Sequence, residues 1–109
     1  MKYPNFLNKN KTIFLVTPSF GCGTEPYKSR LIKSISNLEN LGFKIKQSKH
    51  NFDMPNFFEA HKIDRSKEFM EAYTNKECNL LLSVGGGMFL TEILPFIDFN
   101  TLNNSIPKW

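Results

Sequence analysis

Residues 80–87 read Leu-Leu-Leu-Ser-Val-Gly-Gly-Gly, and residues 88–95 continue as Met-Phe-Leu-Thr-Glu-Ile-Leu-Pro. An apolar strand is therefore expected to run into three glycines and then into a short helix. Consecutive glycines carry no side-chain chemistry but give the backbone wide conformational freedom. Such a turn at a helix N-terminus lets backbone N–H groups approach an anion closely. The stretch predicts a buried strand, a tight turn and a backbone site for negative charge.

Three short segments have the composition of β-strands. Residues 12–17 (TIFLVT) and 79–84 (NLLLSV) are largely apolar, which is typical of strands that are buried on both faces of a parallel sheet. Residues 43–46 (FKIK) alternate apolar and charged side chains, and this pattern favours a position nearer to the sheet edge.

The segments between these strands predict helices. Pro26 suits the first position of a helix that ends at Gly42. Asp64 is expected to cap a helix that runs to about residue 74. A short helix around residues 88–94 is expected to end or kink at Pro95, and residues 98–104 add one more turn. The apolar sides of the first two helices are Leu31, Ile32, Ile35, Leu38 and Leu41, and Phe69, Met70 and Tyr73.

This alternation of strands and helices predicts an α/β fold, a three-layer sandwich with a mostly parallel sheet. Residues 1–11 are polar and are expected to form a loose leader, and residues 48–62 form a long irregular segment. Residues 12–109 show no repeat or linker and form one domain. Ligands of such sheets bind at the carboxyl ends of strands, so the loops after the first and third strands are the expected site.

Composition narrows the class of protein. A chain of 109 residues with 40% apolar and 22% charged residues is expected to be a soluble domain, with most of its 11 Phe in the core. The net charge of +4 is spread without a basic stripe, so no nucleic-acid partner is expected. No segment approaches the about 20 apolar residues of a membrane span, and no signal peptide is evident. Two cysteines indicate reduced thiols, so we expect a cytoplasmic protein without a membrane partner.

Cofactor motifs are incomplete. Gly21, Cys22 and Gly23 resemble part of a dinucleotide-binding fingerprint, but Pro26 stands where the third glycine belongs. Residues 46–49 also lack the acidic residue that would bind a ribose. We expect no cofactor, and the glycine loop is best interpreted as flexible.

The candidate metal ligands are His50, His61, Cys22 and Cys78, and their spacing matches no zinc pattern. We therefore expect no metal. Cys22 lies at a strand end, where a nucleophile would be placed, but no base is near it in sequence. A structural thiol is the better interpretation.

The remaining polar candidates have ordinary explanations. Ser19 and Ser83 lie outside a Gly-x-Ser-x-Gly elbow. Ser19 is expected to line the mouth of a pocket, and Ser83 to point into the sheet or cap the strand end. Glu92 is expected on the surface or as a helix cap, and Arg65 as a solvated charge after Asp64.

The three glycines Gly85, Gly86 and Gly87 are not followed by the Lys-Ser/Thr of a phosphate-binding loop. Two interpretations remain open. The glycines either allow only a tight, closely packed turn, or they form a cradle of N–H groups for an anion or an oxyanion.

Taken together, five segments resemble the LD-carboxypeptidase family of serine peptidases, including its microcin C self-immunity branch. The segments are residues 16–19 (VTPS), 64–65 (DR), 83–87 (SVGGG), 92–99 (EILPFIDF) and 107–109 (PKW). The resemblance implies a flavodoxin-like or glutamine-amidotransferase-like N-terminal domain, present here without the nucleophile strand and the C-terminal domain. The usual family block is Arg-Gly-Gly-Tyr-Gly, so residues 83–87 look closer to the immunity branch.

Members of this family hydrolyse an amide bond next to a terminal carboxylate. The murein branch removes D-alanine from peptidoglycan peptides, and the immunity branch cleaves a peptidyl-nucleotide antibiotic. The family's catalytic serine lies in a Gly-Tyr-Ser-Asp motif on the next strand, and its glutamate and histidine come from the C-terminal domain. None of the three has a counterpart in residues 1–109. What the resemblance does imply is that Gly85 and Gly86 contribute backbone to an oxyanion hole.

The sequence therefore predicts the N-terminal fragment of a serine carboxypeptidase, inactive by itself, which takes a small peptide-like substrate once completed. The alternative is a non-catalytic anion- or nucleotide-binding α/β module. An unpaired sheet edge and uncovered apolar surface also predict self-association, such as a homodimer.

Overall fold

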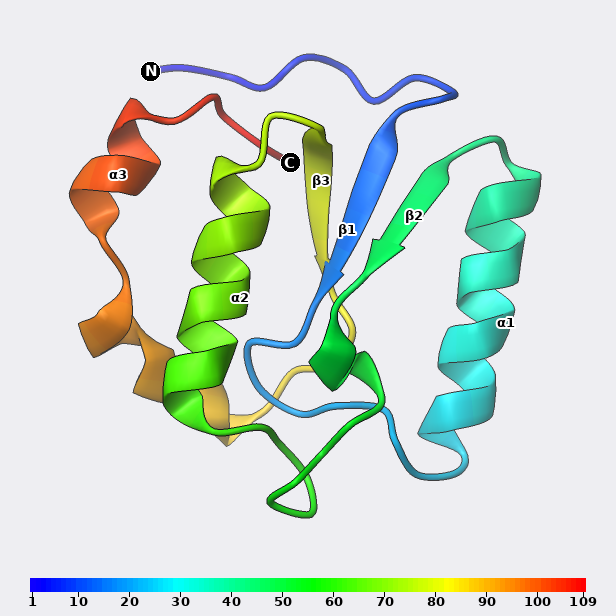
Figure 1. Ribbon diagram of the computed structural model, residues 1–109. Coiled ribbons are helices and arrows are strands. Elements are labelled where there is room, and N and C mark those ends of the chain that lie inside the picture. The colour runs from blue at the N-terminus through cyan, green and yellow to red at the C-terminus, as the bar shows by residue number, and fades with distance from the viewer.

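The computed structural model describes residues 1–109 and contains one sheet of three parallel strands in the order β2-β1-β3 (Figure 1). The strands are β1 (Thr12–Val16), β2 (Lys44–Gln47) and β3 (Cys78–Ser83). In the register of the sheet, Ile13 lies opposite Ile45 on one side and Leu80 on the other. The predicted parallel α/β fold is confirmed, with strand bounds that differ by about one residue.

Helices cover both faces of the sheet, as Figure 1 shows. Helix α1 (Tyr27–Asn40) lies on the side of β2 and is followed, after that strand, by the single 3₁₀ turn η1 (Lys49–Asn51). Helix α2 (Lys62–Thr74) lies on the other side, with the 3₁₀ helix η2 (Met88–Phe96) and helix α3 (Phe99–Asn104) beyond it. The result is a three-layer arrangement.

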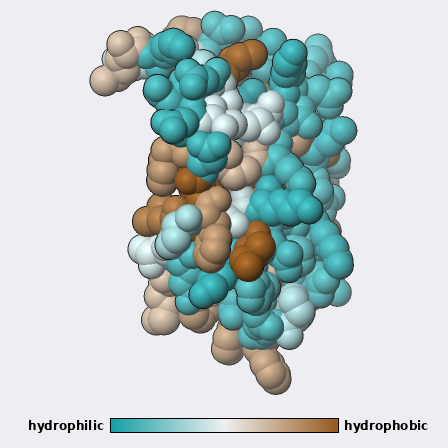
Figure 2. Space-filling model, turned by 60° about the vertical axis from the view of Figure 1, so that its left-hand side comes forward, coloured by the Kyte–Doolittle hydropathy of each residue, from teal (hydrophilic) through white to brown (hydrophobic).

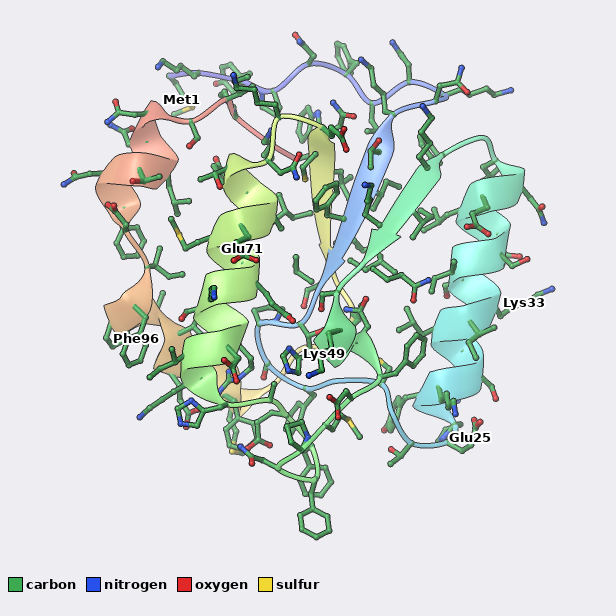
Figure 3. All side chains as sticks on the ribbon, viewed as in Figure 1. Met1, Glu25, Lys33, Lys49, Glu71 and Phe96 are labelled. Atoms are coloured by element: carbon green, nitrogen blue, oxygen red, sulfur yellow. The ribbon has the colours of Figure 1, made fainter.

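The core lies between β1 and α1. Ile13 and Leu15 are buried and pack with Ile35 of α1. The predicted apolar stripe of α1 is too wide, because Ile32 and Leu41 are 53% and 60% exposed. Only the row of α1 residues directly above the sheet reaches the core, through Leu31, Ile35 and Leu38. On the opposite side of α1, Lys33 points away from the sheet (Figure 3).

The expectation that most Phe residues lie in the core is wrong. None of the 11 falls in the buried class. Those most exposed are Phe6, Phe57, Phe58, Phe96 and Phe99. Three strands and the helices on either side enclose too little volume for so many rings, and even Phe43 and Phe52, which pack against the core, are only partly buried.

Two predicted helix starts and one helix type need correction. Pro26 is the N-cap of α1 rather than its first residue. Helix α2 begins before Asp64, because the His61 ring accepts a hydrogen bond from the Ile63 N–H at 3.3 Å and caps the helix there. The segment after the glycines is a 3₁₀ helix that continues through Pro95 to Phe96.

Residues 1–11 contain no helix or strand and cross the upper end of the sheet in Figure 1. Leu7 packs against the core, and the Asn10 N–H donates to the Gly42 carbonyl at 2.8 Å. The Trp109 indole donates to the Asn5 carbonyl at 2.7 Å, so both ends of the chain meet. None of the helices combines the length and the apolar character that crossing a membrane requires.

One face of the molecule is rich in apolar side chains. Figure 2 shows brown residues gathered on the side that carries η2 and α3. Leu90, Leu94 and Phe96 are each more than 40% exposed there, and Phe96 points away from α2 (Figure 3). The expected uncovered apolar surface is therefore present, and self-association through it stays a prediction.

Candidate functional site

The loops that follow β1 and β3 together line a cavity of about 620 Å³. Because β1 and β3 are parallel neighbours, their carboxyl ends bring these two loops to the same edge of the sheet. The loop before α2 and the start of α1 complete the walls. The lining residues are Phe20, Gly21, Cys22, Thr24, Tyr27, Met54, Phe58, Val84, Gly85, Gly86, Met88 and Phe89.

The glycine turn presents backbone donors that the chain itself does not use. Val84 directly follows β3, and its N–H still donates to the Val16 carbonyl of β1 at 3.0 Å. The N–H groups of Gly85, Gly86 and Gly87 donate no hydrogen bond to any backbone or side-chain acceptor of the chain. Two of these three consecutive free donors, Gly85 and Gly86, line the cavity, where an anion or an oxyanion could accept from them.

Steric packing explains two of the three glycines but not the third. A Cβ at Gly85 would lie 2.7 Å from the Phe20 carbonyl oxygen. A Cβ at Gly87 would lie 2.0 Å from the Phe20 ring, and the φ of Gly87 is +138°. A Cβ at Gly86 would meet nothing within 4 Å. Close packing therefore accounts for Gly85 and Gly87, and it gives no reason for a glycine at position 86.

Ser19 is not at the mouth of the cavity. Its side chain is fully buried, and its Oγ has no hydrogen-bond partner. A Cβ at Gly87 would lie 2.9 Å from this Oγ, so the hydroxyl lies beneath the turn rather than in the cavity. The expected position is wrong because the chain after β1 stays buried through Ser19, and Phe20 is the first side chain to reach the cavity wall.

The Ser83 side chain is hydrogen-bonded to the backbone of the glycine turn. Its Oγ donates to the Gly85 carbonyl at 2.7 Å, which agrees with the predicted capping role at the strand end. A hydroxyl held in this way points at its own backbone. Ser83 is therefore not arranged as a nucleophile.

Arg65 also lies elsewhere than its sequence context indicated. It was expected to be solvated, but it is 1% exposed. Its Nε donates to the Ala60 carbonyl at 2.8 Å, and its Nη1 donates to the carbonyls of Pro18 at 2.7 Å and Phe89 at 2.8 Å. Its Nη2 pairs with the Glu92 carboxylate at 2.7 Å. The guanidinium fork thus uses four of its five N–H donors.

These contacts join α2 to both loops of the cavity. Pro18 lies two residues before Phe20, and Phe89 lines the cavity itself. Helix α2 is capped three residues earlier than expected, by His61 instead of Asp64, so Arg65 is the fourth residue of the helix rather than the first. The available signal was that Arg65 is one of two arginines in a chain of 14 basic residues, since Arg alone offers a rigid fork of donors.

Both cysteines are free thiols and both are buried. Cys22 lines the cavity, and its Sγ donates to the Val84 carbonyl at 3.4 Å. Burial raises the pKa of Cys22 above that of a free thiol, and burial likewise raises the pKa of Cys78. A raised pKa disfavours the thiolate, which is the nucleophilic form. The interpretation of Cys22 as a structural thiol agrees with this environment.

The histidines serve to hold segments together. His50 of η1 pairs through Nδ1 with Glu68 of α2, and the Ser48 Oγ donates to the same carboxylate at 2.9 Å. Neither histidine lines the cavity. No three of the His, Cys, Asp and Glu side chains form a group that could hold a metal ion.

Both the sequence and the structure of this chain are similar to those of known proteins. Residues 13–109 match the sequence model of the LD-carboxypeptidase N-terminal domain. The structure is similar to an MccF-like protein from Bacillus anthracis str. Ames, with 24% identity and a TM-score of 0.83, over 96% of this chain and 31% of that chain. The wild-type microcin C7 self-immunity protein MccF gives 25% identity and a TM-score of 0.83, over 98% and 31%.

A muramoyltetrapeptide carboxypeptidase from Oxalobacter formigenes is similar at 27% identity and a TM-score of 0.66, over 84% of this chain and 29% of that chain. No curated protein gives a match. The chain thus spans about a third of the length of these solved relatives. The family match over residues 13–109 covers the sheet, Arg65 and the glycine turn, and the chain belongs to the LD-carboxypeptidase N-terminal domain family.

Proposed function

We propose that this domain forms the oxyanion-binding wall of a serine carboxypeptidase site, which hydrolyses an amide bond next to a terminal carboxylate. The observation that carries the proposal is the run of three free N–H groups of Gly85, Gly86 and Gly87, of which the first two line the cavity. Preorganised backbone donors stabilise the negative charge of a tetrahedral intermediate, and the loss of one such donor lowers kcat by about 10²–10³-fold.

The nucleophile is proposed to lie outside residues 1–109. Within the chain, Ser19 is buried, Ser83 is bonded to the turn, and Cys22 has a raised pKa. None of these side chains is paired with a general base. In this proposal the 109-residue chain has no hydrolytic activity by itself, and the acid, base and nucleophile are supplied by further polypeptide.

The outer edge of β3 supports this arrangement. The Leu81 N–H donates to the Trp109 carbonyl at 2.9 Å, and the Trp109 N–H donates to the Asn79 carbonyl at 3.3 Å. This alternation is the hydrogen-bond pattern of a parallel strand pair. A strand that continued in this register would end at the same edge of the sheet as the glycine turn, where a nucleophile would be needed.

A chimera tests the proposal. Residues 1–109 are joined to the remaining two thirds of the Bacillus anthracis MccF-like protein and assayed on a peptidyl-nucleotide and on a murein L,D-peptide. We expect the chimera to hydrolyse one of the two substrates and the chain alone to hydrolyse neither. Hydrolysis by the purified 109-residue chain above the buffer rate would contradict the proposal.

Gly86 offers a matched pair of variants in the chimera. Gly86→Ala keeps the N–H and meets open space, so its kcat is expected to stay near that of the parent. Gly86→Pro removes the N–H and is expected to lower kcat by about 10²–10³-fold. Circular dichroism spectra establish that both variants are folded. Equal kcat values for the two folded variants would exclude a catalytic role for this donor.

The alternative function is an anion- or nucleotide-binding module without catalysis. The same free N–H groups favour it, because they need only an anion and no nucleophile. Calorimetric titration of the chain with adenosine monophosphate, a flavin nucleotide and a peptide carboxylate separates the two functions. Nucleotide binding together with an inactive chimera would support the alternative.

A further inference from the structure

We infer that the cavity beside the glycine turn binds an uncharged aromatic or aliphatic side chain of the substrate. This inference rests on the proposed function, in which the glycine N–H groups face the reacting amide. It adds the chemical class of the group next to that amide. The argument depends on the charge of the cavity, its aromatic walls and its exposed rim.

The cavity has no charged wall. Eight of its 12 lining residues are hydrophobic and none carries a formal charge, so a charged side chain would lose its hydration there and find no ion-pair partner in the walls. The volume of about 620 Å³ is in the range of sites for small organic ligands. The terminal carboxylate of a substrate therefore has to find its cation outside this cavity.

Aromatic rings form much of the wall. The Phe20 ring meets Phe58 edge to face with centroids 6.2 Å apart, and it meets Phe89 with centroids 5.1 Å apart. A further ring adds to such a cluster in the same geometry. Met54 and Met88 also line the cavity, and their flexible thioethers adapt to apolar groups of different shape.

The rim of the cavity is apolar and open. Tyr27, Phe58 and Met88 line the cavity and are 57%, 62% and 78% exposed. Apolar side chains that gather around a cavity and remain in water are typical of a binding site. A bound apolar group would remove part of this surface from water, and a charged group would not gain from it.

The inner wall is fixed by backbone packing. A Cβ at Gly23 would lie 2.3 Å from the Phe52 carbonyl oxygen, and one at Gly21 would lie 2.9 Å from the His50 carbonyl oxygen. Backbone therefore packs against backbone at these two positions. The cavity is preformed on this side, so its preference for apolar groups does not depend on a rearrangement of the loop.

Nuclear magnetic resonance titration of the 109-residue chain tests the inference. The two ligands are N-acetyl-phenylalanine amide and N-acetyl-aspartate amide, which differ in the charge of one side chain. The methyl signals of Met54 and Met88 report on the cavity, and the amide signals of Gly85 and Gly86 report on the turn. We expect the phenylalanine ligand to bind at least about tenfold more tightly and to shift the methyl signals.

Neighbouring phenylalanines supply the matched variants. Phe58→Asp places a charge in the cavity wall and is expected to abolish binding of the phenylalanine ligand. Phe57→Asp makes the same change at a residue that is 84% exposed and does not line the cavity, so its Kd is expected to stay unchanged. Equal affinity for the two ligands, no binding of either, or an unchanged Kd in Phe58→Asp would overturn the inference.

The two sets of signals separate this inference from the proposed function. If the phenylalanine ligand shifts the methyl signals but not the glycine amides, the apolar preference stands and the proposed role of the turn fails. If both ligands shift the glycine amides equally and leave the methyl signals unmoved, the role of the turn is supported and the apolar preference fails.

Discussion

The loops that line the cavity have two sides, one facing the cavity and one facing α2, and these sides differ in how many of their polar groups are hydrogen-bonded. On the cavity side, the three N–H groups of residues 85–87 have no partner, and no lining residue is charged. On the α2 side, the carbonyls of Pro18 and Phe89 and the Glu92 carboxylate all accept from Arg65. A surface can keep its donors free for a ligand when a fully bonded contact behind it holds the backbone in place.

The energies of the two sides differ for the same reason. Exposed N–H groups of a turn can bond to water, so leaving them free costs little. A buried guanidinium without partners would cost several kcal/mol, so its bonds resist any movement of the loops. The Arg65 contacts therefore hold the cavity loops in position, and the glycine turn exposes its free N–H groups on the other side of these loops.

Removing the Arg65 contacts is expected to destabilise the chain more than any other change proposed below. Arg65→Met leaves the Glu92 carboxylate and three carbonyls without their donor, so the free energy of unfolding is expected to fall by about 3–5 kcal/mol. Arg30→Met makes the same change at an exposed residue of α1 and is expected to change it by less than about 0.5 kcal/mol. Urea denaturation measures both, and equal losses would refute the role of Arg65.

Within the glycine turn, Gly87 and Gly86 are expected to differ. Gly87→Ala forces an L side chain to a φ of +138° and into the Phe20 ring, so a loss of about 1–3 kcal/mol is expected. Gly86→Ala meets open space and is expected to cost less than about 0.5 kcal/mol. Thermal unfolding compares the two variants. A larger loss for Gly86→Ala would mean that the turn is packed differently.

Glu92→Gln tests the ion pair separately from the other Arg65 contacts, because it removes a charge but keeps an acceptor for Arg65. The Glu92 side chain is 46% exposed, so solvent screens the ion pair, and the expected loss is about 1 kcal/mol or less. The remaining bonds from Arg65 to Ala60, Pro18 and Phe89 are unaffected. If urea denaturation gives a loss equal to that of Arg65→Met, the ion pair rather than the carbonyl bonds holds the loops.

The smallest expected effect concerns the thiols. Burial raises the pKa of Cys22 and Cys78, so alkylation by iodoacetamide at pH 8 is expected to be slower than that of a free cysteine and to accelerate with pH. A raised folded-state pKa also means that stability is unaffected below the pKa of an unperturbed thiol, 9.0, and falls as the pH rises through the raised pKa. Single Cys→Ser variants assign the rates, and rapid alkylation at pH 8 would contradict the burial.

Local sequence patterns predicted much of the fold. The apolar runs of β1 and β3 and the alternation of β2 identified the three strands and the edge position of β2. The glycine turn was recognised in the same way, because a run of glycines after an apolar strand is visible without any knowledge of neighbours. Helix ends were less accurate, since His61 rather than Asp64 caps α2.

The sequence predicted only those parts of the candidate site that neighbouring residues in the chain form by themselves. Residues 85–87 are adjacent in sequence, but the roles of Ser19 and Arg65 depend on segments that approach from far along the chain. Arg65 bonds to carbonyls 47 and 24 residues away. The aromatic walls of the cavity are also assembled from separate loops, so no local pattern indicates them.

Hydrophobic periodicity and glycine content act over a few neighbouring residues, so the three parallel strands and the glycine turn can be predicted from the amino-acid order alone. The tertiary structure was needed to show which glycine has free space at its Cβ position, which side chain holds the loops and what kind of group the cavity can accept. Those properties depend on burial and hydrogen bonding between distant segments. Arg65 shows the reason most clearly, since an arginine is solvated or fully bonded according to what folds against it.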